Sequence, residues 1–239
     1  DVAKGAADMI LTDDNFATIV AAIEEGRGIY SNIRKAIHYL LSCNIGEIIT
    51  IFVATLLDLG QMPLVPVQLL WLNLVTDSLP ALALGVEPVE EGVMEQRPRD
   101  ARAELFDRRF SLRLAWQGLM VGGLTLAAYF LGLTRLSRPG LEGAAANTMA
   151  FATLTLARLF HGFNCRENRS ILRMGLSGNP ASLAAFGVGV LLLLAVLLIP
   201  ALHGLFLVAD LTLAQLGMIL GLAVLPTLCI QITRIARGK

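Results

Sequence analysis

Two stretches decide how this sequence folds: SCNIGEIITIF, residues 42–52, and LLWLNLVTDSLPALALG, residues 69–85. Both are dominated by apolar residues, yet the first carries Glu47 and the second carries Asp77. A carboxylate in the middle of a membrane helix costs roughly 2.5 kcal/mol or more. The pattern therefore predicts two membrane-spanning helices. Their carboxylates need a partner that compensates the cost of burial, and such groups have a function by default.

The composition is that of a membrane protein. Of the 239 residues, 55% are hydrophobic and only 16% are charged, whereas soluble domains carry about a quarter charged residues. Residues 181–202 contain no charged residue, and this run exceeds the roughly 20 residues that a helix needs to span a bilayer. The net charge is zero and no cluster indicates nucleic-acid binding. The three cysteines lack the spacing of a metal site or a disulfide framework.

Six apolar segments predict an all-α membrane protein, a bundle of six transmembrane helices, with a short α/β remnant at the N-terminus. The segments are residues 36–57, 65–84, 112–133, 145–163, 182–199 and 213–235. The first is expected to continue an amphipathic helix that begins near Phe16. Before it we expect a small helical piece, a short strand at Met9–Leu11, and Asp13 or Asp14 as the cap of the next helix. The sequence opens on DVAKGAAD rather than on Met, and we expect it to be the later part of a longer chain.

Small residues and a proline predict local features of these helices. Gly118 and Gly122, like Gly217 and Gly221, have the spacing that permits close helix contact. Gly46 beside Glu47, and Pro80 after Asp77, are expected to loosen helical backbone and to free carbonyl groups.

The basic residues predict the orientation in the membrane. With six spans both ends lie on one side, and 16 of the 19 Lys and Arg residues fall on that side. The positive-inside rule then places both termini in the cytoplasm. These residues are Lys4, Arg27, Arg34, Lys35, Arg97, Arg99, Arg102, Arg108, Arg109, Arg113, Arg166, Arg169, Arg173, Arg234, Arg237 and Lys239.

The polar residues of the first two spans form two sets that each share a helix face. Asn44 stands three residues before Glu47, and Asn73, Thr76 and Asp77 are spaced at i, i+3 and i+4. A short connection makes the two spans an antiparallel hairpin, so the polar faces are expected to oppose each other. The groups are all oxygen-bearing, which suits a hard cation such as calcium, with its six to eight oxygen ligands.

The plainer alternative is that these groups only form hydrogen bonds between helices. That interpretation is preferred for Asn44, Thr76 or Ser42 taken alone. For Glu47 and Asp77 together we prefer a cation pathway, because ionisable groups within a membrane are functional by default.

Two long motifs resemble a known family. They are TDDNFATIVAAIEEGRGIYSNIRKAIHYLLSCNIGEI, residues 12–48, and PVQLLWLNLVTDSLPALALGVEP, residues 66–88. The chain resembles P-type ATPases of the calcium-pump kind, close to the sarco/endoplasmic reticulum type and of bacterial composition, over its whole length. The resemblance implies that residues 1–28 are the end of the phosphorylation domain with a linker helix, and residues 29–239 the last six transmembrane helices. The first four transmembrane helices, the actuator and nucleotide domains and the phosphorylated Asp are absent from this sequence.

The resemblance also implies a ligand set. The calcium ligands of the family fall on Asn44, Glu47, Asn73, Thr76 and Asp77. Where two-site pumps have a further glutamate, this sequence has Arg158, which predicts one calcium ion per cycle. The alternative for Arg158 is that its side chain extends to the cytoplasmic interface.

The mechanism implied is alternating access in the cell membrane, driven by ATP and Mg²⁺ bound in the missing N-terminal part of the chain. The helix from Phe16 to Leu41 would transmit domain motion to Glu47, and protons on Glu47 and Asp77 would be countertransported. The alternatives are a pump for manganese or sodium, a self-contained six-helix channel or secondary transporter, and a non-pumping homologue. The partners expected are the lipid bilayer and the missing part of the chain, and no nucleic acid.

Overall fold

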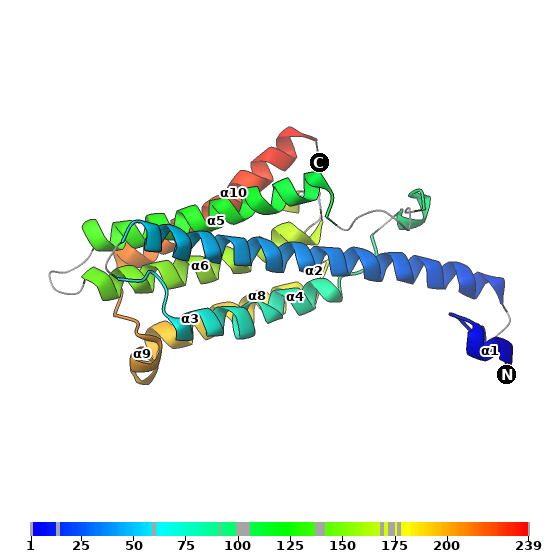
Figure 1. Ribbon diagram of the computed structural model, residues 1–239, viewed down its shortest axis with the longest axis horizontal. Coiled ribbons are helices and arrows are strands. Elements are labelled where there is room, and N and C mark those ends of the chain that lie inside the picture. The colour runs from blue at the N-terminus through cyan, green and yellow to red at the C-terminus, as the bar shows by residue number, and fades with distance from the viewer. Residues whose placement is uncertain are drawn as a thin grey trace.

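The computed structural model describes residues 2–12, 15–58, 61–90, 92–98, 106–136, 142–167, 170–171, 175 and 178–238, and within these the chain is helical and has no strand. Figure 1 shows the long helices lying side by side in an elongated bundle. The prediction of an all-α membrane bundle is confirmed. The elements are α1 Val2–Ala6, α2 Phe16–Leu56, α3 Pro66–Trp71, the π-helical turn η1 Leu72–Thr76, α4 Ser78–Gly85, the 3₁₀ turn η2 Val93–Glu95, α5 Arg108–Thr134, α6 Glu142–Arg166, α8 Pro180–Leu198, α9 Pro200–Phe206 and α10 Leu213–Ala236.

Five of the six predicted spans are helices long and apolar enough to cross a membrane: α2, the α3–η1–α4 unit, α5, α8 and α10. The sixth, predicted at residues 145–163, is α6, whose 25 residues span about 37 Å at 1.5 Å per residue. It is less apolar than the others because it contains several threonines, Asn147, Arg158 and His161.

Helix α6 lies at the centre of the bundle. It contacts α2, η1, α4, α5, α8 and α10, and Thr148, Thr153, Thr155 and His161 are all fully buried on it. Hydroxyl groups of Thr148 and Thr155 donate to carbonyls one turn earlier on the same helix, so they need no water. Because protein surrounds α6 on most sides, it is free to carry polar residues that a lipid-facing helix excludes.

The N-terminal segment differs from the prediction. Residues Met9–Leu11 form no strand, because a strand needs a hydrogen-bonded neighbour and the described part of the chain has none. The following helix is capped by Asn15, whose side chain accepts a hydrogen bond from the backbone N–H of Ala17 at 3.0 Å. Asp13 and Asp14, the predicted caps, lie outside the described residues.

Helix α2 is continuous over 41 residues, from Phe16 to Leu56, and so joins the amphipathic segment to the first span as predicted. Its N-terminal half extends beyond the other long helices toward α1 (Figure 1). At 1.5 Å per residue it is about 60 Å long. No proline interrupts it, so nothing in its sequence breaks the hydrogen-bond ladder.

The second span is interrupted beside Asp77. The backbone N–H of Asp77 donates to the carbonyl of Leu72, five residues earlier, at 2.8 Å, which is the step of a π-helical turn. Pro80 has no N–H, so the carbonyl of Thr76 loses its usual helical donor. The expected loosening of the backbone therefore occurs in this span. Gly46 does not loosen α2, because it lies within the regular helix.

Hydrogen bonds tie the connections to the helices at both ends of the bundle. At one end, Asn32 of α2 donates to the carbonyl of Glu87 at 2.6 Å, and Arg166 of α6 forms an ion pair with the Glu87 carboxylate at 2.8 Å. At the other, Tyr129 donates to the carbonyl of Gln61 at 2.6 Å, and Asn147 to that of Pro63 at 3.1 Å. These bonds hold the connections in place, so that α2 runs antiparallel to α4, and α5 runs antiparallel to α6.

Basic residues collect at the first of these ends, which we call the basic end. It holds the N-terminal half of α2, the segment after α4, the start of α5 and the end of α10, with Arg27, Arg34, Lys35, Arg97, Arg108, Arg109, Arg113, Arg166, Arg234 and Arg237. Arg99, Arg102, Arg169, Arg173 and Lys239 fall outside the described residues. Arg135 is placed at the opposite end.

Glycines allow α2 and α5 to approach closely. A Cβ atom on Gly122 would lie 2.6 Å from the carbonyl oxygen of Gly46, and one on Gly118 would lie 2.5 Å from the side chain of Ile45. The predicted close contact at Gly118 and Gly122 is therefore confirmed. The same prediction for Gly217 and Gly221 is wrong, since among the described residues nothing lies within 4 Å of a Cβ built at either position. The spacing alone does not reveal whether a face meets protein or lipid.

Gly122→Ala should destabilise the protein, by about 1–3 kcal/mol, because the added methyl group meets backbone that cannot move aside. The matched control is Gly123→Ala, where nothing lies within 4 Å of the new Cβ and alanine is the better helix former. Thermal unfolding of the full-length protein in detergent measures both. Equal unfolding temperatures for the two variants would show that α2 and α5 do not depend on this contact.

Candidate cation site

Three segments far apart in sequence supply the polar groups at the centre of the bundle. Helix α2 supplies Glu47, and α6 supplies Arg158. Asn73 lies in η1, and Asp77 directly follows it. Arg158 is fully buried, and Asp77 is 1% exposed. The side chain of Glu47 is 12% exposed. The residues that the sequence singled out in separate spans therefore meet at one buried point.

The guanidinium of Arg158 lies between the two carboxylates. Its Nη2 donates to Oε2 of Glu47 at 2.5 Å, and its Nη1 donates to Oδ2 of Asp77 at 2.8 Å. Nη2 also donates to the carbonyl of Cys43 at 3.2 Å, and Nη1 to Oδ1 of Asn73 at 3.4 Å. The planar fork of an arginine suits this double pairing, which a lysine could not reproduce. The position at the bundle centre excludes the alternative that Arg158 extends to the interface.

Two further side chains orient the carboxylates. Asn73 donates from Nδ2 to Oε1 of Glu47 at 3.1 Å, and Tyr39 donates its hydroxyl to Oδ1 of Asp77 at 3.2 Å. Each carboxylate thus has one oxygen on the guanidinium and the other on a neutral donor. The arrangement fixes both carboxylates facing the same space, which the guanidinium fills.

The other two predicted ligands, Thr76 and Asn44, lie beside the cluster. Thr76 is buried, at 1% exposed, and immediately precedes Asp77. Asn44 is partly exposed on α2, and within the described part of the chain it has no hydrogen bond to the cluster. The structure therefore brings together Glu47, Asn73 and Asp77, with Thr76 adjacent and Asn44 at the edge.

The donor set decides what the cluster can bind. It contains carboxylate, amide and hydroxyl oxygens, which suit a hard cation. Zinc and copper prefer His and Cys ligands, and the described residues contain no group of three or more His, Cys, Asp or Glu that could hold a metal ion. Two carboxylates and one guanidinium leave one negative charge, so a cation that enters gains a net attraction.

Sequence reasoning missed Tyr39. It lies eight residues before Glu47 on α2, with Cys43 midway, so positions 39, 43 and 47 follow one another along a single helix face. A search for further polar residues on the face of Glu47 would have found it. The Cys43 contact uses a backbone carbonyl, which no side-chain pattern reveals.

Similarity to known proteins identifies the family of this chain. Residues 61–236 match the family model described as the C-terminus of cation-transporting ATPases. The chain belongs to this family. It is 43% identical over 99% of its length to calcium-transporting ATPase 1 of Bacillus cereus, and 41% identical over 100% to the calcium-transporting ATPase of Bacillus subtilis. It is 51% identical over 54% of its length to the endoplasmic reticulum calcium ATPase srcA of Aspergillus fumigatus.

The chain spans only part of these relatives. It covers 28% of the Bacillus cereus protein and 26% of the Bacillus subtilis protein. The match to the two Bacillus proteins extends over all the helices that bring Glu47, Asp77 and Arg158 together, whereas the family-model match begins at residue 61, after Glu47.

Arg158→Met should destabilise the protein by about 3 kcal/mol or more, because it leaves two carboxylates buried without their partner. Combining it with Glu47→Gln and Asp77→Asn should restore most of the loss, since no buried charge then remains unpaired. The measurement is thermal unfolding of the full-length protein in detergent, with Arg135→Met at the exposed opposite end as the control. An Arg158→Met protein as stable as the parent would contradict the buried pairing.

Proposed function

We propose that this chain is the ion-translocating part of an ATP-driven calcium pump that exports calcium from the cytoplasm. The observation that carries the proposal is the convergence of Glu47, Asp77 and Asn73 on one buried point. The names of the Bacillus relatives, both calcium-transporting ATPases, support calcium as the ion. ATP and Mg²⁺ would be bound by the part of the full-length protein outside this chain.

The proposed ligands are Asn44, Glu47, Asn73, Thr76 and Asp77. Calcium takes about six to eight oxygens, which two carboxylates and three neutral side chains approach without completing. The π-helical turn supports a backbone contribution, because the carbonyl of Thr76 faces Pro80, which has no N–H to donate. For the ion to bind, the guanidinium of Arg158 must give up part of its contact with the carboxylates.

We propose that one calcium ion moves per cycle. Arg158 keeps a fixed positive charge beside Glu47 and Asp77, and that charge repels a second cation in the same space. Without calcium the cluster carries one negative charge, so one proton on either carboxylate makes it neutral. Protons taken up when calcium leaves would then be carried back, which is proton countertransport.

The proposed orientation places the basic end in the cytoplasm of a cell-membrane protein, as the positive-inside rule favours. Residues 1–28 would then belong to the phosphorylation domain and its linker, and residues 29–239 to the transmembrane domain. Helix α2 connects the two parts without a break, which suits it to transmit motion to Glu47.

The full-length protein should hydrolyse ATP in response to calcium, and Glu47→Gln or Asp77→Asn should reduce calcium-dependent activity at least tenfold, because each removes a charged ligand. The measurement is ATPase activity scanned across calcium, manganese, sodium and potassium. Asp210→Asn, whose side chain is 97% exposed at the opposite end of the bundle, serves as a control. A response to manganese or sodium but not to calcium would overturn the ion assignment, and passive flux without ATP hydrolysis would indicate a channel or secondary transporter.

The number of calcium ions moved per ATP tests the proposal that Arg158 limits the site to one ion. In sealed vesicles the full-length protein should move one calcium per ATP, and Arg158→Glu should raise the ratio toward two by replacing the fixed cation with a ligand. The parent should also raise the pH inside the vesicles as protons leave in exchange for calcium.

Each part of this prediction can fail separately. A ratio of two in the parent refutes the single-ion proposal. An unchanged internal pH, in vesicles shown not to leak protons, refutes countertransport and leaves the ion ratio standing.

A further inference from the structure

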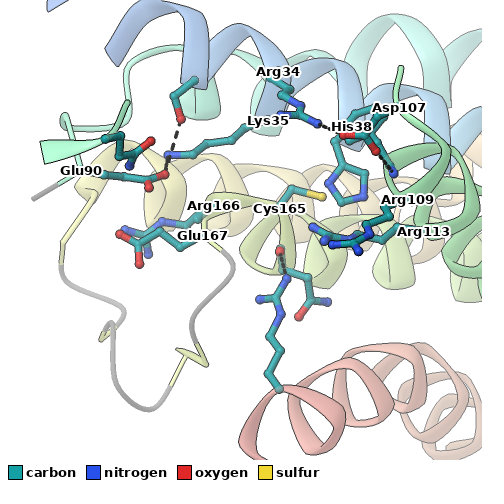
Figure 2. A pocket seen from close by; sticks show the side chains of 15 residues that line it. Arg34, Lys35, His38, Glu90, Asp107, Arg109, Arg113, Cys165, Arg166 and Glu167 are labelled. Carbon is teal, nitrogen blue, oxygen red and sulfur yellow. Dashed lines mark hydrogen bonds and ion pairs between the residues drawn. The ribbon is translucent and has the colours of Figure 1, made fainter. Parts of the chain in front are cut away.

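A second polar site lies at the basic end, apart from the Arg158 cluster. A pocket of about 410 Å³ opens among α2, α5, α6 and α10. Figure 2 shows Arg109 and Arg113 of α5 on one side of it, with Lys35 and Glu90 on the other. The cationic residues that line the pocket are Arg34, Lys35, Arg109, Arg113, Arg166 and Arg234.

Among the described residues that line this pocket, positive charge is in excess. The six cationic residues face three acidic ones, Glu90, Asp107 and Glu167. Ion pairs join Lys35 to Glu90 at 2.7 Å and Arg34 to Asp107 at 3.2 Å. If Glu87, which pairs with Arg166 at 2.8 Å, is counted as well, the described residues around the pocket still hold two more cations than anions.

Two of the arginines that line the pocket are buried and held in place by hydrogen bonds. Arg166 is 1% exposed and Arg234 is 9% exposed, and Arg234 donates from Nη2 to the backbone carbonyl of Asn164 at 2.6 Å. That carbonyl orients the guanidinium. Phe110 packs under Arg34, whose guanidinium carbon lies 4.8 Å from the ring centre. Buried cations held in fixed positions pay little conformational entropy when they bind an anion.

Apolar side chains share one face of α5 with the arginines of the pocket. Leu112 lies three residues after Arg109 and is 61% exposed, and Trp116 is 60% exposed. Trp116 lies one turn beyond Arg113, and tryptophan is enriched where a membrane meets water. The pocket therefore lies where a basic surface changes to one that suits acyl chains.

We propose that this pocket binds the phosphate headgroup of an anionic phospholipid, such as phosphatidylglycerol, from the leaflet at the basic end. Arginine forks bind phosphate oxygens in pairs, and basic pockets between transmembrane helices at a membrane surface bind acidic headgroups. The acyl chains would lie against the exposed residues of α5. The bound headgroup would link α2 to α5, α6 and α10, so the lipid would affect how α2 moves. The proposal does not depend on which ion the protein transports.

The test is the affinity of the purified full-length protein for phosphatidylglycerol, measured by native mass spectrometry in detergent, with phosphatidylcholine for comparison. Arg109→Gln combined with Arg113→Gln should weaken phosphatidylglycerol binding about tenfold or more, since each basic residue contributes substantially to acidic-lipid binding. The matched control is Arg108→Gln with Arg237→Gln, which removes two charges from the same end outside the pocket. An equal loss in the control would mean general surface attraction and would overturn the site.

A second variant changes the affinity in the opposite direction. The Asp107 carboxylate accepts a hydrogen bond from the backbone N–H of Phe110, and this bond is the main reason why the pKa of Asp107 is lowered. The carboxylate is therefore charged at neutral pH. Asp107→Asn removes that charge while keeping a good helix cap, and should tighten phosphatidylglycerol binding several-fold. No tightening would count against the pocket even if the double arginine variant failed to fold. Displacement of the lipid by an equal concentration of inorganic phosphate would assign the site to a soluble anion and overturn the lipid.

Discussion

The bundle depends on the ionic contact of Arg158 with Glu47 and Asp77. Each of these groups would cost several kcal/mol if it were buried without a partner. Their pairing brings together α2, the interrupted second span and α6, which are distant in sequence. Because each member needs the others, the pairing fixes the rotation of the three helices about their axes as well as their contact. The buried charges thus specify one arrangement among the many that apolar packing alone would allow.

The surrounding fold makes this contact possible. Helix α6 can carry Arg158 because other helices enclose it, and α2 can approach α5 because Gly122 leaves room for its backbone. The π-helical turn η1 shifts the helical register just before Asp77. Polar bonds at both ends of the bundle then hold the connections in place. Apolar packing brings the helices together, and these local departures from regular helix shape the polar centre.

Hydropathy predicted the spans to within a few residues, since apolar length is a property of sequence alone. It could not predict the π-helical turn η1, which changes the backbone register without changing the pattern of residues. It misjudged Met9–Leu11, where a short apolar run suits a strand only if a partner strand is present. At the site, residue type was enough to relate Glu47 and Asp77, because membrane charges need partners, whereas the place of Arg158 followed from the family resemblance. Tyr39 escaped because a tyrosine in an apolar helix is not itself unusual.

The unbroken course of α2 has a mechanical consequence. A helix with no proline or kink cannot absorb a displacement along its length, so it acts as a stiff lever. From Phe16 to Glu47 the arm is about 46 Å, and a tilt of about five degrees would displace one end by about 4 Å relative to the other. Such a displacement is larger than a hydrogen bond is long. If α2 turned about its Phe16 end, a rotation of this size would separate Glu47 from the arginine that holds it.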